Sequence, residues 1–185
     1  MLSQVDGYLH AMVPGAVIAA VVYAIAYRPR MRALAGRGLR SGRGREAVLL
    51  LFAMYACGMA LLTLTPTGFD LFSVLEGDWQ EPFFSHGAVS TKLFRTLRYD
   101  RLIFWGNVVM FLPFGFLPAV LWRGSRWYRA LAIAIGVTLT IECWQLCVGR
   151  TFDVDDLLLN ACGAMCGWLL WLLLGKPALY CEELT

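Results

Sequence analysis

Five stretches of roughly 20 residues with almost no charge constrain this chain more than any other feature. Only one contains a charged residue, Glu142. About 20 helical residues cross the ~30 Å hydrocarbon core of a bilayer, and backbone groups there must be satisfied within the segment. Strands of a β-barrel would be shorter and would alternate apolar with polar residues. We therefore predict five transmembrane helices, over Tyr8–Tyr27, Ala47–Thr65, Leu102–Trp122, Ala130–Val148 and Leu157–Gly175.

Composition supports a membrane protein of the all-α class. The chain is 59% hydrophobic and 16% charged, whereas soluble domains are about half apolar and a quarter charged. The first span carries Asp6 before it in place of a basic region, so we expect a retained helix and not a cleaved signal. Four segments follow: two N-terminal helices (1–65), an external loop (66–101), a three-helix core (102–175) and a tail (176–185).

Basic residues predict the orientation. Most of them fall in the loops after the first and third spans and in the tail, which share one side of a five-helix chain. The positive-inside rule places that side in the cytoplasm and the N-terminus outside. The first of these loops is also rich in Gly and could bind nucleic acid. A topology signal that contacts anionic lipid explains it better, so we expect no nucleic-acid partner. The basic residues on this side are Arg28, Arg30, Arg32, Arg37, Arg40, Arg43, Arg45, Arg123, Arg126, Arg129 and Lys176.

The external loop begins with acidic and aromatic residues and ends with basic ones. Leu93, Phe94 and Leu97 would share one face of a helix, which predicts an amphipathic helix lying on the outer surface. Basic residues on the outer side oppose the topology rule. They are either a tolerated exception or attract the phosphate of a lipid or lipid-linked molecule. These residues are Lys92, Arg95, Arg98 and Arg101.

A polar cluster is predicted where the fourth span turns into the fifth. An ionisable residue inside a span suggests function, because its burial is costly unless it is paired or hydrated. Thr138, Glu142 and Gln145 share one helical stripe, and Asp156 and Asn160 share a face of the next span. The short turn between them makes the two spans neighbours. Arg150, Asp153, Asp155 and, from the third span, Asn107 should join this cluster near the outer leaflet.

This cluster allows two interpretations. As a functional site, Glu142 would be an acid or base, and Arg150, Asp155 and Asp156 would assist it. Asn107, Gln145, Asp153, Asn160, Arg98 and Arg101 would bind the substrate. As a structural clasp, the same residues would join the spans. The aspartates offer oxygen ligands to a metal ion, but their spacing is a weak signal, and we expect neither metal nor cofactor.

The cysteines form no secreted disulfide framework. Cys143 and Cys147 are four residues apart, as are Cys162 and Cys166, so each pair shares a helix face. A metal or haem site between the two helices is conceivable. Small residues for close helix packing are the preferred interpretation.

Two motifs resemble the VanZ-like family. The first runs from Asn107 through Pro113 to Gly115. The second is Glu142-x-x-Gln145 followed by the segment from Arg150 to Gly163. Order and spacing match over Trp105–Leu174. The resemblance implies a role in the bacterial cell envelope, in a multi-pass protein of the plasma membrane, since the family's namesake is associated with resistance to teicoplanin.

The resemblance implies no particular reaction, so the question of an enzyme stays open. We expect the cluster to bind, and in one version to modify, a lipid or lipid-linked envelope molecule at the outer leaflet. A proton-coupled lipid transporter and a non-catalytic scaffold that excludes antibiotic are the alternatives. The absence of an inverted repeat in the sequence argues mildly against transport.

Overall fold

The computed structural model describes residues 2–66, 71–78, 82, 84–93 and 101–183. Five of its helices are long and apolar enough to cross a membrane, as predicted. They are α1 (Leu2–Ala35), α2 (Arg43–Leu64), α5 (Arg101–Leu121), α6 (Trp127–Cys147) and α7 (Val154–Leu173). A short helix α3 (Leu71–Glu76) and four two-residue strands accompany them: β1 (Leu39–Arg40), β2 (Val89–Ser90), β3 (Phe152–Asp153) and β4 (Glu182–Glu183).

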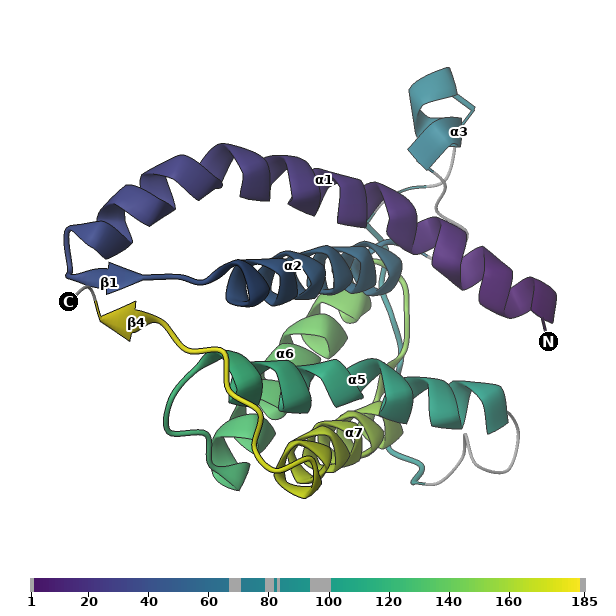
Figure 1. The fold of residues 1–185 in the computed structure, drawn as a ribbon. Coiled ribbons are helices and arrows are strands. Elements are labelled where there is room, and N and C mark those ends of the chain that lie inside the picture. Colours follow the sequence, from purple (N-terminus) through teal and green to yellow (C-terminus); the bar gives the residue numbers. More distant parts are fainter. Residues whose placement is uncertain (1, 67–70, 79–81, 83, 94–100, 184–185) are drawn as a thin grey trace.

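The helices form two groups. Helices α1 and α2 pack along each other as a hairpin, and α5, α6 and α7 form a second group below them (Figure 1). The tightest packing is between α5 and α7, and α2 contacts both α5 and α6. Much of α1 is exposed and apolar, including Val17, Val22 and Ile25, which suits a helix surrounded by lipid.

The loop between the first two helices is shorter than predicted. Arg28, Arg30 and Arg32 continue helix α1, while Arg43 and Arg45 already belong to α2. Hydropathy detects where apolar residues stop, whereas a helix ends where its hydrogen bonds stop. Arginine is a good helix former, so the helices extend beyond their apolar parts.

The C-terminal tail returns to this connection. Strand β4 pairs antiparallel with β1, and Arg40 forms an ion pair of 2.7 Å with Glu182. The backbone N–H of Leu179 donates to the carbonyl of Val120, near the C-terminal end of α5, at 2.8 Å. The α1–α2 connection, the α5–α6 connection and the tail therefore lie at one end of the bundle (Figure 1).

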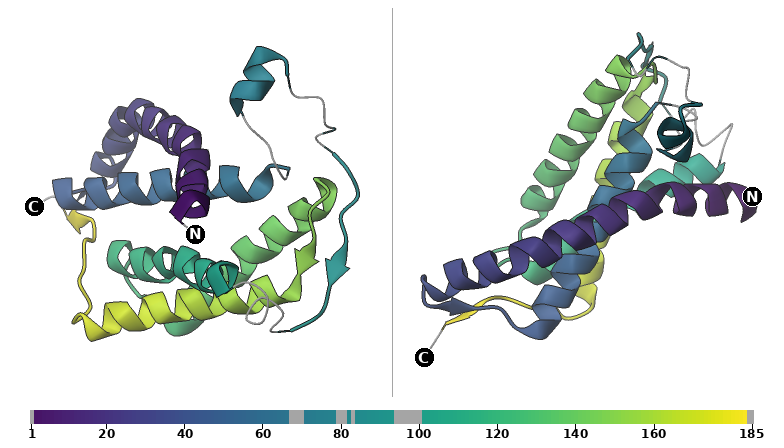
Figure 2. Two further views of the ribbon diagram at one scale, coloured as in Figure 1. Left: turned by 90° about the vertical axis from the view of Figure 1, so that its right-hand side faces the viewer. Right: turned by 90° about the horizontal axis from the view of Figure 1, so that it is seen from above.

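At the opposite end, part of the long loop covers the α6–α7 turn. Strand β2 pairs in parallel with β3, and the two lie side by side in Figure 2. The N–H groups of Ser85 and Gly87 donate to the carbonyls of Cys147 and Leu146 at 3.0 and 2.9 Å. Figure 2 shows the loop running across the ends of α6 and α7, an arrangement that the sequence did not predict.

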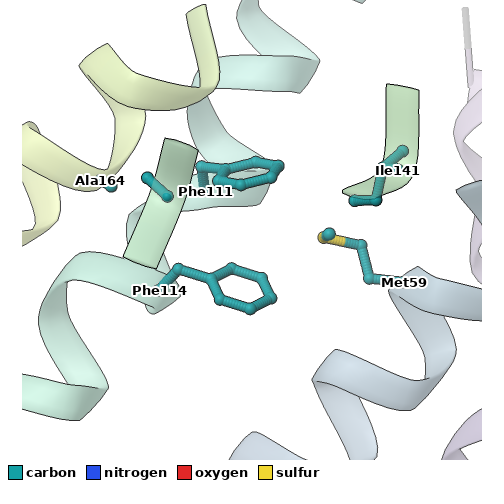
Figure 3. Packing of buried hydrophobic residues seen from close by; sticks show 6 residues of the cluster. Met59, Phe111, Phe114, Ile141 and Ala164 are labelled. Atoms are coloured by element: carbon teal, nitrogen blue, oxygen red, sulfur yellow. The ribbon is translucent and has the colours of Figure 1, made fainter. Parts of the chain in front are cut away.

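The core lies where α2, α5, α6 and α7 meet. Phe111 and Phe114 of α5 stack with ring centroids 5.2 Å apart and face Met59 of α2 and Ile141 of α6 (Figure 3). Ala164 of α7 belongs to the same cluster and is fully buried. This core fixes α6 and α7 next to α5, so it positions the turn that follows α6.

Glycines allow the close approach of α5 and α7. A Cβ atom on Gly163 would clash with the carbonyl of Val108, and one on Gly167 with the carbonyl of Leu112. Their four-residue spacing is the small-xxx-small pattern that lets another helix approach closely, and the partner here is α5. Helix α5 continues through Pro113 and Pro118, although each proline removes a backbone donor from the helix.

We predict that Gly163→Val separates α5 from α7 and destabilises the protein by about 1–3 kcal/mol, because overpacking forces backbone shifts. Thermal unfolding of the purified protein in detergent measures this. The matched control is Gly136→Val, since a Cβ at Gly136 meets nothing within 4 Å. Equal stability of the two variants would contradict the close α5–α7 contact.

Candidate functional site

Glu142 lies at the centre of the cluster and is 2% exposed. Its Oε2 atom accepts a hydrogen bond of 2.8 Å from the backbone N–H of Asp153. The carboxylate of Asp153 in turn accepts from the N–H of Asp155 at 3.0 Å and caps helix α7. These bonds satisfy backbone donors at the turn and at the start of α7, which have no partner within the helix. Glu142 thus ties α6 to the start of α7.

A third helix joins through Asn107 of α5. Its side-chain amide donates to the carboxylate of Asp156, in the first turn of α7. Asp155, beside it, is fully buried. Acidic side chains are favoured at this position because the N-terminus of a helix carries partial positive charge. The predicted convergence of spans three, four and five is therefore seen in the contacts.

Another part of the cluster faces α2. The last four carbonyls of a helix have no partner within the helix. Three side chains from the end of α6 and from the turn after it supply donors to the carbonyls of α2 at its C-terminal end. Trp144 Nε1 donates to Leu64 at 2.7 Å, Gln145 Nε2 to Thr63 at 3.1 Å, and Arg150 Nη1 to Leu62 at 3.2 Å and Thr65 at 3.4 Å.

The predicted site thus has two parts. We call Glu142, Asp153, Asp155, Asp156 and Asn107 the carboxylate cluster. Sequence reasoning placed Gln145 and Arg150 beside the carboxylates, whereas both side chains donate hydrogen bonds to carbonyls of α2. Arg150 still lies close enough to Glu142 and Asp156 for electrostatic interaction. The role of Trp144 was missed, although its indole donor, one position from Gln145, was a usable signal.

Two buried polar side chains lie one turn deeper. Thr138 is one helical turn from Glu142 and is fully buried, and Asn160 is one turn from Asp156 and is 5% exposed. Within the described part of the chain, Thr138 Oγ1 and Asn160 Oδ1 have no hydrogen-bond partner. Buried polar atoms normally find one, so each of these oxygens requires an explanation.

The predicted basic contribution from the external loop is described only in part. Arg101 is exposed and begins helix α5. Arg98 and most of the predicted interfacial helix, residues 94–100, lie outside the described residues. The roles given to Arg98 and Arg101 stay predictions.

Contrary to our expectation, the cysteines do not pack between helices. Cys143, Cys147, Cys162 and Cys166 are all exposed, and none forms a disulfide. Each pair does share a helix face, but that face points out of the bundle, where a thiol behaves as a small apolar group. Among the described residues, no group of three His, Cys, Asp or Glu side chains could hold a metal ion.

A second polar network at the other end was not predicted. Glu46 follows the Arg-rich segment directly and is 8% exposed. Its carboxylate accepts hydrogen bonds from Tyr23, Arg30 and Ser41. Arg45, also buried, lies 3.7 Å from it. Glu46 lies one residue outside the uncharged span, so a search for charges inside spans overlooked it. Arg30 and Arg45, two of the arginines from which the orientation is predicted, thus also have a structural role.

These features define a class: a multi-pass α-helical membrane protein with a buried carboxylate cluster at one end of its bundle. The chain matches the model of the VanZ/LLP1 family over residues 43–175, well over half of its length, and belongs to that family. The match begins at α2 and so extends beyond Trp105–Leu174, the region of the motif resemblance. No curated protein and no solved structure matches the chain.

The contacts of Glu142 predict a difference between two substitutions. Glu142→Leu leaves the N–H of Asp153 without its acceptor and should destabilise the protein by about 1–3 kcal/mol. Glu142→Gln keeps an acceptor oxygen and should lose much less stability. Thermal unfolding in detergent compares the two. Equal losses would mean that this hydrogen bond does not hold α6 to α7.

Proposed function

We propose that this protein binds a lipid or lipid-linked molecule of the bacterial cell envelope at the outer leaflet of the plasma membrane. The carboxylate cluster receives the polar part of that molecule. Family membership supports an envelope role, and we propose that this binding underlies a contribution to glycopeptide (teicoplanin) resistance. The proposed function is binding of this molecule. The acid or base role predicted for Glu142 would extend it to modification of the bound molecule.

The proposed orientation places the N-terminus outside and the C-terminus in the cytoplasm. It is supported by the position of the basic segments. The α1–α2 connection, the α5–α6 connection and the tail gather at one end, where β1 pairs with β4 and Arg123 lies 5.7 Å from the ring centre of Tyr180. Basic segments favour the cytoplasmic side. The carboxylate cluster is at the other end, and so at the outer leaflet.

One observation carries the proposal: the bundle contains more buried polar groups at and beneath the carboxylate cluster than a clasp needs. A clasp is complete once Glu142 holds Asp153 and Asn107 holds Asp156. Thr138 and Asn160 add buried oxygens that take no part in it. An unpaired buried polar atom costs about 1–3 kcal/mol. Such a cost is expected where a protein keeps polar atoms ready for a ligand.

The orientation predicts which cysteines a membrane-impermeant thiol reagent reaches. Cys147 is exposed at the end of α6, near the cluster, and Cys181 lies in the tail. In intact cells, a variant that retains only Cys147 should be labelled. A variant that retains only Cys181 should react only after permeabilisation. The reverse pattern would invert the orientation and place the cluster at the cytoplasmic leaflet.

The binding proposal predicts that Glu142→Gln inserts and folds but retains about tenfold less co-purified envelope lipid, because a charge-assisted hydrogen bond is lost. Mass spectrometry of the detergent-purified protein measures retention, and teicoplanin susceptibility of the producing cells is the second measurement. Glu76→Gln, an exposed site in α3, is the matched control. Retention and susceptibility equal to the control would refute the proposal.

A further inference from the structure

The threonines of the long helices show that the hydroxyl of Thr138 is exceptional. Thr63, Thr65 and Thr140 each donate to the carbonyl four residues earlier in the chain, at 2.8 Å. This bond satisfies a hydroxyl in an apolar environment at little cost. The same choice is open to Thr138, in the interior of α6, yet no described residue bonds to its Oγ1 atom. Its hydroxyl is therefore available to another partner.

Asn160 offers a second available oxygen at the same depth. Helices α6 and α7 run in opposite directions from a short turn. Steps of four residues lead from Glu142 to Thr138 and Ala134 on α6, and from Asp156 to Asn160 and Ala164 on α7. Both alanines belong to the core cluster and are fully buried. Thr138 and Asn160 thus form a layer between this apolar core and the carboxylates above.

The chemistry of this layer selects its ligand. An amide oxygen only accepts hydrogen bonds, while a hydroxyl can accept as well as donate. A phosphate group offers mainly acceptors, so it would pair with the hydroxyl of Thr138 but would leave Asn160 Oδ1 without a donor. A hydroxyl or a protonated amine offers N–H or O–H donors and satisfies both orphaned oxygens.

We infer that Thr138 and Asn160, beneath the carboxylate cluster, bind the hydrogen-bond-donating part of the envelope molecule, a hydroxyl or ammonium group, and not its phosphate. This inference rests on the proposed function and specifies its ligand class. The inference assigns a sugar hydroxyl or an amine, and not the phosphate, to this layer. The sequence had not distinguished between these parts of the headgroup. The phosphate would lie outside this layer.

Three lipids with identical acyl chains test the inference on the full-length protein in detergent. Phosphatidylethanolamine and phosphatidylcholine share a phosphate, but only the first has N–H donors. Diglucosyldiacylglycerol has hydroxyl donors and no phosphate. Lipid retention is measured by mass spectrometry. We expect about fivefold to tenfold greater retention of at least one donor lipid than of phosphatidylcholine, as one or two hydrogen bonds would give. Which donor lipid is preferred identifies ammonium or hydroxyl as the source.

Substitutions locate the preference. Thr138→Val and Asn160→Leu remove the available oxygens and should abolish it. Thr140→Val is the matched control, because its hydroxyl is already bonded to the carbonyl of Gly136, and it should keep the preference. Melting temperatures of the lipid-free variants exclude misfolding as the cause. The expected result is a stable Thr138→Val protein, since it loses only an unpaired polar atom.

Two results would overturn the inference. One is equal retention of all three lipids, or greater retention of phosphatidylcholine, which has a phosphate but no N–H donor, than of both donor lipids. The other is an unchanged preference in Thr138→Val and Asn160→Leu, which would mean that the layer holds only buried water. In both cases lipid still binds, so the proposed function survives. Failure of every lipid to bind the wild-type protein would instead refute the proposed function itself.

Discussion

The ends of helices α2 and α7 impose the constraint on which the rest of the structure depends. A helix end leaves backbone groups without partners, and in a membrane protein water cannot be relied on to supply them. The backbone N–H groups at the start of α7 and in the turn before it donate to the carboxylates of Asp153 and Glu142. The carbonyls at the end of α2 accept hydrogen bonds from the side chains of Trp144, Gln145 and Arg150. The polar residues at the end of α6 and in the turn after it thus hold three helices together, and their placement fixes where a ligand could meet the protein.

The clasp and the binding site are therefore not exclusive interpretations. Glu142 and Asp156 have partners that hold α5, α6 and α7, which gives them fixed positions. Thr138 and Asn160 lie deeper, and their Oγ1 and Oδ1 atoms form no hydrogen bond with the described residues. A rigid acidic frame with available oxygens beneath it is an arrangement suited to binding a polar headgroup without reorganisation. Arg150 secures α2, and it also lies close enough to Glu142 and Asp156 to interact with their carboxylates.

Much of the fold and part of the site could be predicted from the sequence. The five apolar helices follow from hydropathy, and the close helix contact at Gly163 and Gly167 is consistent with their four-residue spacing. The convergence of Glu142, Asn107 and the aspartates follows from a short turn and helical periodicity. The exposure of the four cysteines could not be predicted, because helical spacing gives a shared face but not its direction. Glu46 was missed because hydropathy marks the apolar span and not the helix end.

The sequence alone determined that the chain has five helices long and apolar enough to cross a membrane, and which family its motifs resemble, because both are recorded in local composition and spacing. Only the tertiary structure decided which polar residues belong to the carboxylate cluster and which bond to α2. Gln145 and Arg150 bond to α2, which lies more than 80 positions earlier in the chain. The tail pairs with β1, and the long loop covers the α6–α7 turn, through two-residue strands with no sequence signal. Contacts between distant segments depend on how helices pack, and periodicity within one segment carries no record of its partner.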